Sequence, residues 1–124
     1  SGFFEGIDYL LPVPLFSSRL RQRGYNQSEL LARGISRVTG IPLCTDAVVR
    51  SRNNATQTHK SGYARWQNVD RLFLSTPHAA NLHDKHILLV DDVLTTGATL
   101  VACADALLGV ENIKISVLTL AWAR

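Results

Sequence analysis

The sequence has few of the features that mark a membrane protein, a disulfide-rich protein or a zinc site. None of its apolar runs reaches the ~20 residues that a membrane-spanning helix needs, and no signal-peptide pattern opens the chain. Its two cysteines, Cys44 and Cys103, form neither a CxxC motif nor another metal-binding spacing. These absences predict a cytoplasmic protein with two reduced, packed thiols and no membrane insertion.

Internal repeats, linkers and low-complexity segments are absent as well. Hydrophobic residues make up 46% of the sequence and charged residues 19%, which are the proportions of a globular domain. A chain of 124 residues with this composition predicts a single domain, residues 1–124, that is long enough to bury a substantial core.

Acidic residues are scarce in residues 19–71, which leaves that segment strongly basic. It holds ten of the 13 Lys and Arg residues but only three acids, a balance of +7, whereas the whole chain carries +3. Such a balance predicts a polyanionic partner. Two kinds of partner fit this charge equally well: a sugar phosphate with a pyrophosphate group, or a nucleic acid.

One segment, residues 87–99, carries the clearest functional pattern. It begins with a short apolar run that is typical of a buried parallel strand, and Asp91 and Asp92 follow that run directly. A turn rich in hydroxyl groups and glycine comes next, and a helical pattern starts near Ala98. The N-terminus of such a helix attracts an anion, and carboxylates accept hydrogen bonds from the vicinal hydroxyls of ribose. The segment therefore predicts a site for a sugar phosphate.

Strands alternate with helices along the sequence. The expected strands are residues 7–13, 47–50, 72–74, 86–91 and 113–120. The expected helices run from Asn26 or Ser28 to Gly40 and from 98 to 108. Residues 51–71 are expected to form a long loop and 76–85 a surface connection. This alternation predicts an α/β fold with a parallel sheet covered by helices on both faces and ligands at the carboxyl ends of the strands.

The order of hydrophobic run, two acids, two further residues and Thr-Thr-Gly-x-Thr resembles the phosphoribosyl pyrophosphate (PRPP) signature of type I phosphoribosyltransferases. The resemblance implies a Rossmann-like parallel sheet flanked by helices, without a clear hood. It also implies that Asp91 and Asp92 hold the ribose hydroxyls, and that Mg²⁺ arrives with PRPP and meets these carboxylates only through water. The residues that would surround the 5′-phosphate are Thr95, Thr96, Gly97, Ala98 and Thr99.

Two basic segments narrow the resemblance. The run Arg-x-Arg-Gly-Tyr-Asn-Gln at 21–27 looks like the pyrophosphate loop of the ComF/GntX family, phosphoribosyltransferase-like proteins associated with bacterial competence. Residues 50–57 resemble the flexible loop of that family, so Arg52 would act beside Asp91 and Asp92 in catalysis. By the same resemblance, the pyrophosphate would be met by Arg21, Arg23, Gly24, Asn26 and Gln27.

Two departures from related families also bear on function. Members of the ComF/GntX family commonly carry an N-terminal zinc ribbon, and this sequence has no cysteine pairs that could build one. Thr95 stands where hypoxanthine-guanine salvage enzymes have an aspartate, so purine salvage of that type is disfavoured.

The sequence leaves three functions open. The first is transfer of a phosphoribosyl group to an unknown acceptor with release of pyrophosphate. The second is a non-catalytic accessory of DNA uptake that binds PRPP or single-stranded DNA, which the aromatic residues Tyr25, Tyr63 and Trp66 among the basic ones favour. The third is a scaffold domain. The sequence does not determine the oligomeric state, which could be a monomer or a homodimer.

Overall fold

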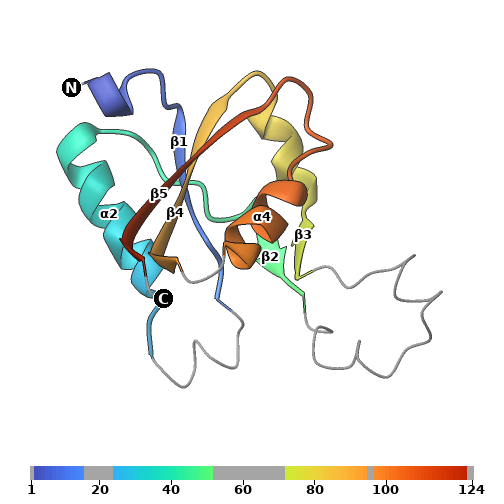
Figure 1. The fold of residues 1–124 in the computed structure, drawn as a ribbon. Coiled ribbons are helices and arrows are strands. Elements are labelled where there is room, and N and C mark those ends of the chain that lie inside the picture. Colours follow the sequence, from blue (N-terminus) through green and yellow to red (C-terminus); the bar gives the residue numbers. More distant parts are fainter. Residues whose placement is uncertain (1, 16–23, 52–71, 95–96, 123–124) are drawn as a thin grey trace, which may run out of the picture.

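The central sheet of the molecule has one strand in the middle and one parallel strand on either side of it (Figure 1). The computed structural model describes residues 2–15, 24–51, 72–94 and 97–122. In this part of the chain the order of the sheet is β1 (Tyr9–Pro12), β4 (His86–Leu94) and β5 (Lys114–Trp122). Both outer strands pair with β4 in parallel, as the sequence predicts.

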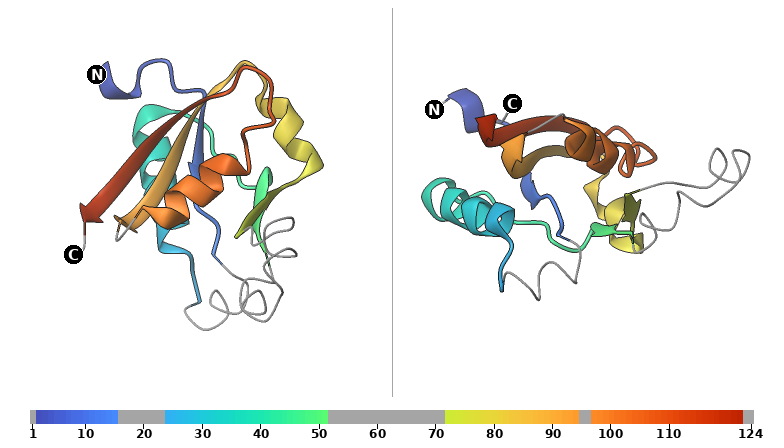
Figure 2. Two further views of the ribbon diagram at one scale, coloured as in Figure 1. Left: turned by 45° about the vertical axis from the view of Figure 1, so that its right-hand side comes forward. Right: turned by 60° about the horizontal axis from the view of Figure 1, so that its bottom comes forward.

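Two helices, α2 (Gln27–Thr39) and α4 (Ala98–Asp105), lie on opposite sides of this sheet (Figure 2). Successive residues of a strand point to opposite faces, so β4 contributes alternate side chains to two clusters. Leu88 and Val90 pack on the side of α2, and Ile87 and Leu89 pack on the side of α4. The predicted α/β fold, a parallel sheet flanked by helices, is confirmed.

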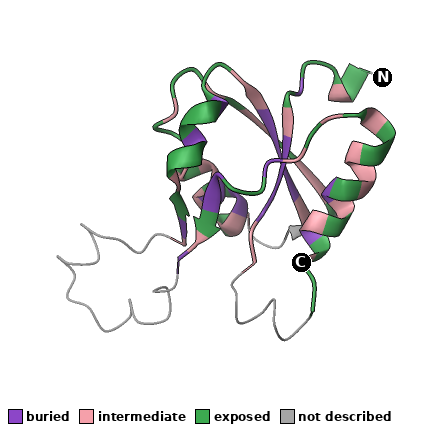
Figure 3. Ribbon diagram, turned by 180° about the vertical axis from the view of Figure 1, so that it is seen from behind, coloured by how far each residue is buried: buried purple, intermediate pink, exposed green. Residues whose placement is uncertain are grey.

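The middle strand is the most deeply buried part of the fold (Figure 3). Residues 87–90 have no exposed surface, because β4 has a neighbouring strand at each edge and a helix over each face. A strand in this position needs apolar side chains on both faces, which is why its apolar residues form a continuous run instead of alternating with polar ones.

Helix α2 begins and ends at the residues that its sequence predicts. The Asn26 side chain accepts hydrogen bonds from the backbone N–H groups of Ser28 and Glu29, which caps the first turn. At the other end Gly40 has φ 81°, a left-handed conformation that glycine adopts without strain. These two local signals fix the length of the helix.

A second, smaller sheet corrects the expectation that all strands join one parallel sheet. Strands β2 (Val48–Arg50) and β3 (Phe73–Ser75) pair with each other in antiparallel orientation. Residues 51–71 show no helical period in the sequence, and an antiparallel pair needs no crossover helix. The Arg50 guanidinium lies 5.1 Å from the centre of the buried Phe73 ring and so fastens the two strands together.

Several element boundaries also differ from the prediction, by one to three residues. β4 continues to Leu94, three residues beyond the expected end at 91, because β5 pairs with it that far. α4 ends at Asp105 and turns occupy 106–109, where the helix was expected to reach 108. The connection at 76–85 contains a 3₁₀ helix, η3 (Pro77–Leu82), which the Thr76 side chain caps.

Both cysteines are free and buried, as the sequence predicts. Among the described residues, no helix combines the length and the apolar character that crossing a membrane would require.

Candidate functional site

The candidate site lies where strands end and helices begin. The strands β1 and β4 end, and the helices α2 and α4 begin, at the same end of the sheet, in the lower part of Figure 1. Ligands of open α/β sheets bind at this edge, because the backbone N–H groups of the helix N-termini and the side chains beyond the strands converge there. The carboxyl end of β4, the middle strand, carries the acidic pair.

Asp91 and Asp92 are both half-buried, and a serine from α2 connects them. The Ser28 hydroxyl donates to Oδ1 of Asp91 across 3.0 Å, and it also lies 3.5 Å from Oδ1 of Asp92. The backbone N–H of Asp92 donates both to the Ser28 Oγ, at 3.2 Å, and to Oδ1 of Asp91, at 3.0 Å. The acidic pair is therefore held in place before any ligand arrives.

The surroundings of Asp91 raise the pKa of its carboxyl group. Burial is the largest cause, and the side-chain hydrogen bond and the negative charge of neighbouring Asp92 also raise the pKa, whereas the hydrogen bond from the Asp92 backbone N–H lowers it. The hydrogen bond from Ser28 also lowers the pKa. Burial thus leaves the Asp91 carboxyl group only partly solvated, and a hydroxyl group of a ligand could donate a hydrogen bond to it.

The Cys103 thiol of α4 lies within electrostatic range of both Asp91 and Arg50. Burial raises the pKa of the fully buried Cys103 thiol to about 12, with a further rise from the charge of Asp91 and a decrease from that of Arg50. At neutral pH this thiol is protonated and therefore a poor nucleophile. The structure brings Arg50 of β2 and Asp91 of β4 into electrostatic range of the same atom, although 41 positions separate them in the sequence.

The N-terminus of α4 has features that favour an anion. Gly97 takes the cap position with φ 85°, and no described side chain caps the first turn. That turn contains no acidic residue, with Ala98 exposed and Thr99 half-buried. These three residues of the predicted phosphate-binding set therefore lie at the helix end that the resemblance assigns to the 5′-phosphate.

The N-terminus of α2 is organised differently. The Asn26 amide caps the helix and also donates to the Val13 carbonyl oxygen across 3.2 Å, so both of its polar atoms have partners within the fold. Gly24, at φ 84°, and Gln27 are exposed at the same edge, where they are accessible to a ligand. A cavity of about 160 Å³, lined in part by Pro14 and Asn26, opens beside them.

Five of the predicted site residues lie outside the described residues. They are Arg21, Arg23, Arg52, Thr95 and Thr96. Of the described ones, the structure brings Asp91, Asp92, Gly97, Ala98 and Thr99 to one edge with Gly24, Asn26 and Gln27.

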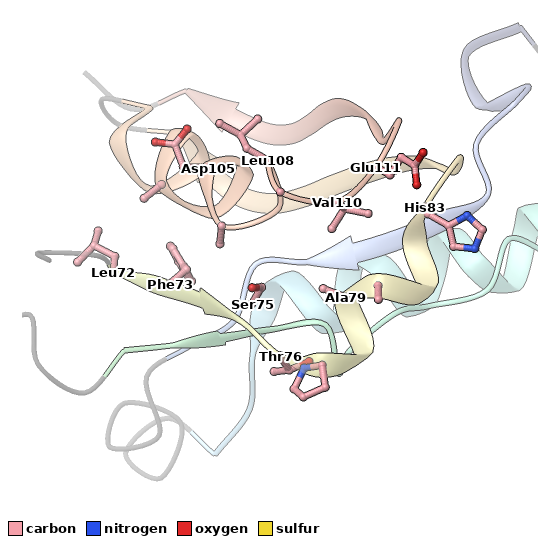
Figure 4. Close-up of a pocket in the computed structure, with 15 residues that line it drawn as sticks. Leu72, Phe73, Ser75, Thr76, Ala79, His83, Asp105, Leu108, Val110 and Glu111 are labelled. Carbon is pink, nitrogen blue, oxygen red and sulfur yellow. The ribbon is translucent and has the colours of Figure 1, made fainter. Parts of the chain in front are cut away.

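A cavity larger than the one beside Asn26 lies elsewhere, between α4 and the segment from β3 to η3 (Figure 4). It measures about 1000 Å³ and has a mostly apolar lining that includes Phe73, Ala79 and Val110, with Asp105 and Glu111 also at its wall. None of the predicted site residues that the structure describes lines it. The charged and hydrogen-bonding groups, rather than the volume, therefore locate the candidate site.

Ser28 is the site residue that the sequence analysis missed. One signal could have revealed it, since Ser28 and Ala32 are spaced i, i+4 and both are buried on the face of α2 that packs on the sheet. A polar residue at the N-terminal end of such a face lies near the strand ends. Its hydrogen-bond partner, Asp91, is 63 residues away along the chain, and no local sequence pattern indicates that the two residues meet.

Comparison with known proteins agrees with this geometry. The sequence matches the family described as phosphoribosyl transferase domain over residues 25–123. The chain belongs to this family, and its parallel sheet with flanking helices is the fold of a type I phosphoribosyltransferase-like domain. Within the family its relatives are ComF-like competence proteins.

Three curated relatives illustrate this. Competence protein F of Haemophilus influenzae is 38% identical over 108 residues, which cover 86% of this chain and 47% of the relative. DNA utilization protein YhgH of Escherichia coli K12 is 38% identical over 102 residues, covering 82% and 43%. Competence protein ComFC of Bacillus subtilis is 35% identical over 99 residues, covering 80% and 38%. The chain thus spans less than half the length of these relatives.

A solved structure, the purine phosphoribosyltransferase from Pyrococcus horikoshii, is also similar. It aligns with a TM-score of 0.44 at 15% sequence identity, over 90% of this chain and 85% of that one.

Proposed function

We propose that this domain binds PRPP at the carboxyl end of β4 and transfers its phosphoribosyl group to a nucleophilic acceptor, with release of pyrophosphate. The observation that supports this most directly is the half-buried pair of Asp91 and Asp92 beside the N-termini of α2 and α4. Membership in the phosphoribosyl transferase family supports the same class of substrate.

In this reaction the bond between C1 of the ribose and the pyrophosphate oxygen breaks, and its electron pair leaves with the pyrophosphate. A lone pair of the acceptor forms the new bond to C1, and the acceptor loses a proton to solvent. Asp91 and Asp92 would accept hydrogen bonds from the ribose hydroxyls and so hold C1 in line with the acceptor. The N–H groups at the start of α4 would bind the 5′-phosphate.

The predicted roles of the arginines follow from charge. Negative charge grows on the departing pyrophosphate, and arginine offers planar, bidentate donors for phosphate oxygens. Arg21, Arg23 and Arg52 are the residues that we propose for this task.

The chemistry of the acidic pair fits Mg²⁺ as an ion shared with the substrate. Magnesium prefers oxygen ligands and keeps several waters, and carboxylates such as those of Asp91 and Asp92 can meet those waters. In the part of the chain that the structure describes, no group of three or more His, Cys, Asp or Glu could hold a metal ion. The remaining ligands would therefore be substrate oxygens, and the bound ion would neutralise charge on the pyrophosphate.

Calorimetric titration of PRPP with Mg²⁺ tests the proposal. The wild-type domain is compared with the double variant Asp91→Asn, Asp92→Asn, which keeps the shape of both side chains and removes their charge. Because hydrogen bonds to charged groups are strong, we expect the double variant to lose about hundredfold or more in affinity.

A matched control removes the same number of charges elsewhere. Asp105→Asn with Glu111→Gln changes two exposed acids beside the cavity between α4 and η3, and we expect unchanged PRPP affinity. A folded wild type that fails to bind PRPP would rule out the proposed function. If binding is established, a screen of amine and base acceptors for pyrophosphate release would identify the acceptor.

A second function, binding of single-stranded DNA without turnover, is favoured by two observations. Relatives carry the names competence protein and DNA utilization protein, and residues 19–71 hold ten basic residues against three acids. Fluorescence anisotropy with a labelled single strand would test it, because binding through phosphates weakens steeply as salt rises. Loss of DNA binding on addition of PRPP would show that both ligands use one site.

A further inference from the structure

Ser28 is a polar side chain in a position that is normally apolar. It is 4% exposed, and it lies in the first turn of α2 on the face that packs against the sheet. A buried hydroxyl costs free energy unless it is hydrogen-bonded. Its described partners are both members of the acidic pair, so the reason for a serine here is connected with Asp91 and Asp92.

The hydrogen bonds give Ser28 a defined direction. A hydroxyl has one proton to donate, and the shorter contact, 3.0 Å against 3.5 Å, assigns that proton to Oδ1 of Asp91 rather than to Asp92. The oxygen of Ser28 then accepts from the backbone N–H of Asp92. Because the same N–H also donates to Oδ1 of Asp91, two donors meet one carboxylate oxygen and orient the other, Oδ2.

Hydrogen bonds hold the helical turn that contains Ser28 in place. Asn26 caps the turn that contains Ser28 and donates to the Val13 carbonyl oxygen at 3.2 Å, and the Val13 N–H donates to the Val90 carbonyl oxygen at 2.9 Å. The first turn of α2 is therefore fastened to the strand that carries the acidic pair. A movement of this turn would move the Asp91 carboxylate with it.

We propose that Ser28 is a positioning residue for PRPP recognition, which orients Oδ2 of Asp91 toward the ribose hydroxyls and joins the first turn of α2 to the ribose subsite. The inference rests on the proposed function, because it takes the ribose of PRPP as the group that Asp91 binds. Ser28 itself is shielded from the ligand and acts through Asp91.

The test separates the two halves of the substrate. Ribose 5-phosphate and Mg²⁺-pyrophosphate are titrated separately, and then PRPP, into the wild type and into Ser28→Ala. We expect the variant to bind ribose 5-phosphate and PRPP about tenfold or more weakly, the size of a lost hydrogen bond to a charged group. Affinity for Mg²⁺-pyrophosphate is expected to fall much less, since Asp91 would meet this half-ligand only through waters of the ion.

Three further variants distinguish positioning from packing. Ser28→Thr keeps the hydroxyl and is expected to restore ribose 5-phosphate affinity. Ser28→Cys keeps the volume with only a weak donor, so it is expected to behave as Ser28→Ala does and provides the test should the alanine variant not fold. Ser36→Ala makes the same substitution farther along α2 and is expected to change no affinity.

Each outcome decides the matter. Equal loss for both half-ligands, equal loss in Ser28→Thr, or no loss in a folded Ser28→Ala or Ser28→Cys variant would overturn the role of Ser28 while leaving the proposed function intact. A wild type that binds PRPP in none of these titrations would overturn the proposed function, and the role of Ser28 with it.

Discussion

The two helices that begin at the candidate site differ in what their first turns do. α2 has a side-chain cap, Asn26, and an acid, Glu29, in its first turn. α4 starts at a left-handed glycine, has no acid in its first turn, and no described side chain caps it. Both caps and acids satisfy the positive end of a helix. In α2 that capacity is used by the Asn26 side chain and by Glu29, whereas the described residues at the start of α4 supply neither a side-chain cap nor an acid.

This difference indicates a division of labour at one edge of the sheet. The N-terminus of α4 would bind the phosphate, and that of α2 would hold the carboxylates of Asp91 and Asp92 in position through Ser28. Changes that make α4 resemble α2 are therefore expected to reduce ligand binding, and changes that weaken the cap of α2 are expected mainly to reduce stability.

Ala98→Asp is expected to have the largest effect, because it gives the first turn of α4 an acid like that of α2. Two negative charges about 4 Å apart near a protein surface repel by ~1–4 kcal/mol, which corresponds to about fivefold to several hundredfold in affinity for ribose 5-phosphate or PRPP. Calorimetric titration measures this loss. The control Ala98→Asn is nearly isosteric and uncharged, so retention of the full loss there would argue against a phosphate at this helix end.

Gly97→Ala is expected to have the next largest effect. The residue has φ 85°, where an L-residue with a side chain costs roughly 1–2 kcal/mol. We expect the free energy of unfolding in urea to fall by about that amount. Gly109→Ala, at a glycine for which no positive φ is found, is the matched control. Similar losses in both variants would mean that conformation at the start of α4 is not the cause.

Asn26→Ala removes the cap of α2 and is expected to cost about 1 kcal/mol in the free energy of unfolding. The loss of the hydrogen bond to Val13 adds to the effect in the same direction. The affinity of α4 for inorganic phosphate or ribose 5-phosphate is expected to fall much less than in Ala98→Asp. If phosphate affinity fell as far as in Ala98→Asp, the result would contradict the view that α4 binds the phosphate while the cap of α2 serves mainly stability.

Asp91→Asn is expected to have the smallest effect on stability, and that effect depends on pH. Burial raises the pKa of Asp91 in the folded protein above its unfolded value, so its contribution to stability is present below the unfolded pKa, near 3.9, and is lost as pH rises through the folded pKa. The variant is therefore expected to gain stability relative to the wild type between acid and neutral pH.

The gain is expected to stay below about 1 kcal/mol, since half-burial leaves the carboxyl group partly screened by solvent. Urea unfolding of both proteins at several pH values measures it. A stability difference that is independent of pH, or that falls toward neutral pH, would contradict the raised pKa of Asp91.

The sequence predicts those parts of the molecule that depend on local signals. Asn26 and Gly40 mark the ends of α2, and the apolar run before Asp91 marks the buried middle strand, because capping and burial depend on neighbouring residues. The family resemblance adds the turn that is predicted to bind phosphate. Of its residues, Gly97, Ala98 and Thr99 lie at the N-terminus of α4.

Non-local pairing accounts for what the sequence does not predict. The extension of β4 to Leu94 depends on β5, and the antiparallel orientation of β2 and β3 depends on a pairing across residues 51–71. The contact between Ser28 and Asp91 likewise joins residues that are far apart in the chain. Patterns of period 2 or 3.6 describe which face of an element is apolar, but not which partner that face will meet.

The place of Asp91 and Asp92 in the middle strand also determines how the site responds to partial unfolding. β4 has hydrogen-bonded neighbours on both edges, and residues 87–90 are inaccessible to solvent, so its amide protons are expected to exchange only when the whole sheet opens. Asp91 and Asp92 belong to this strand, so they are expected to keep their positions as long as the sheet stays closed. Fraying at the chain ends or opening of a surface turn would therefore leave the acidic pair intact, and its geometry would persist until the domain unfolds as a whole.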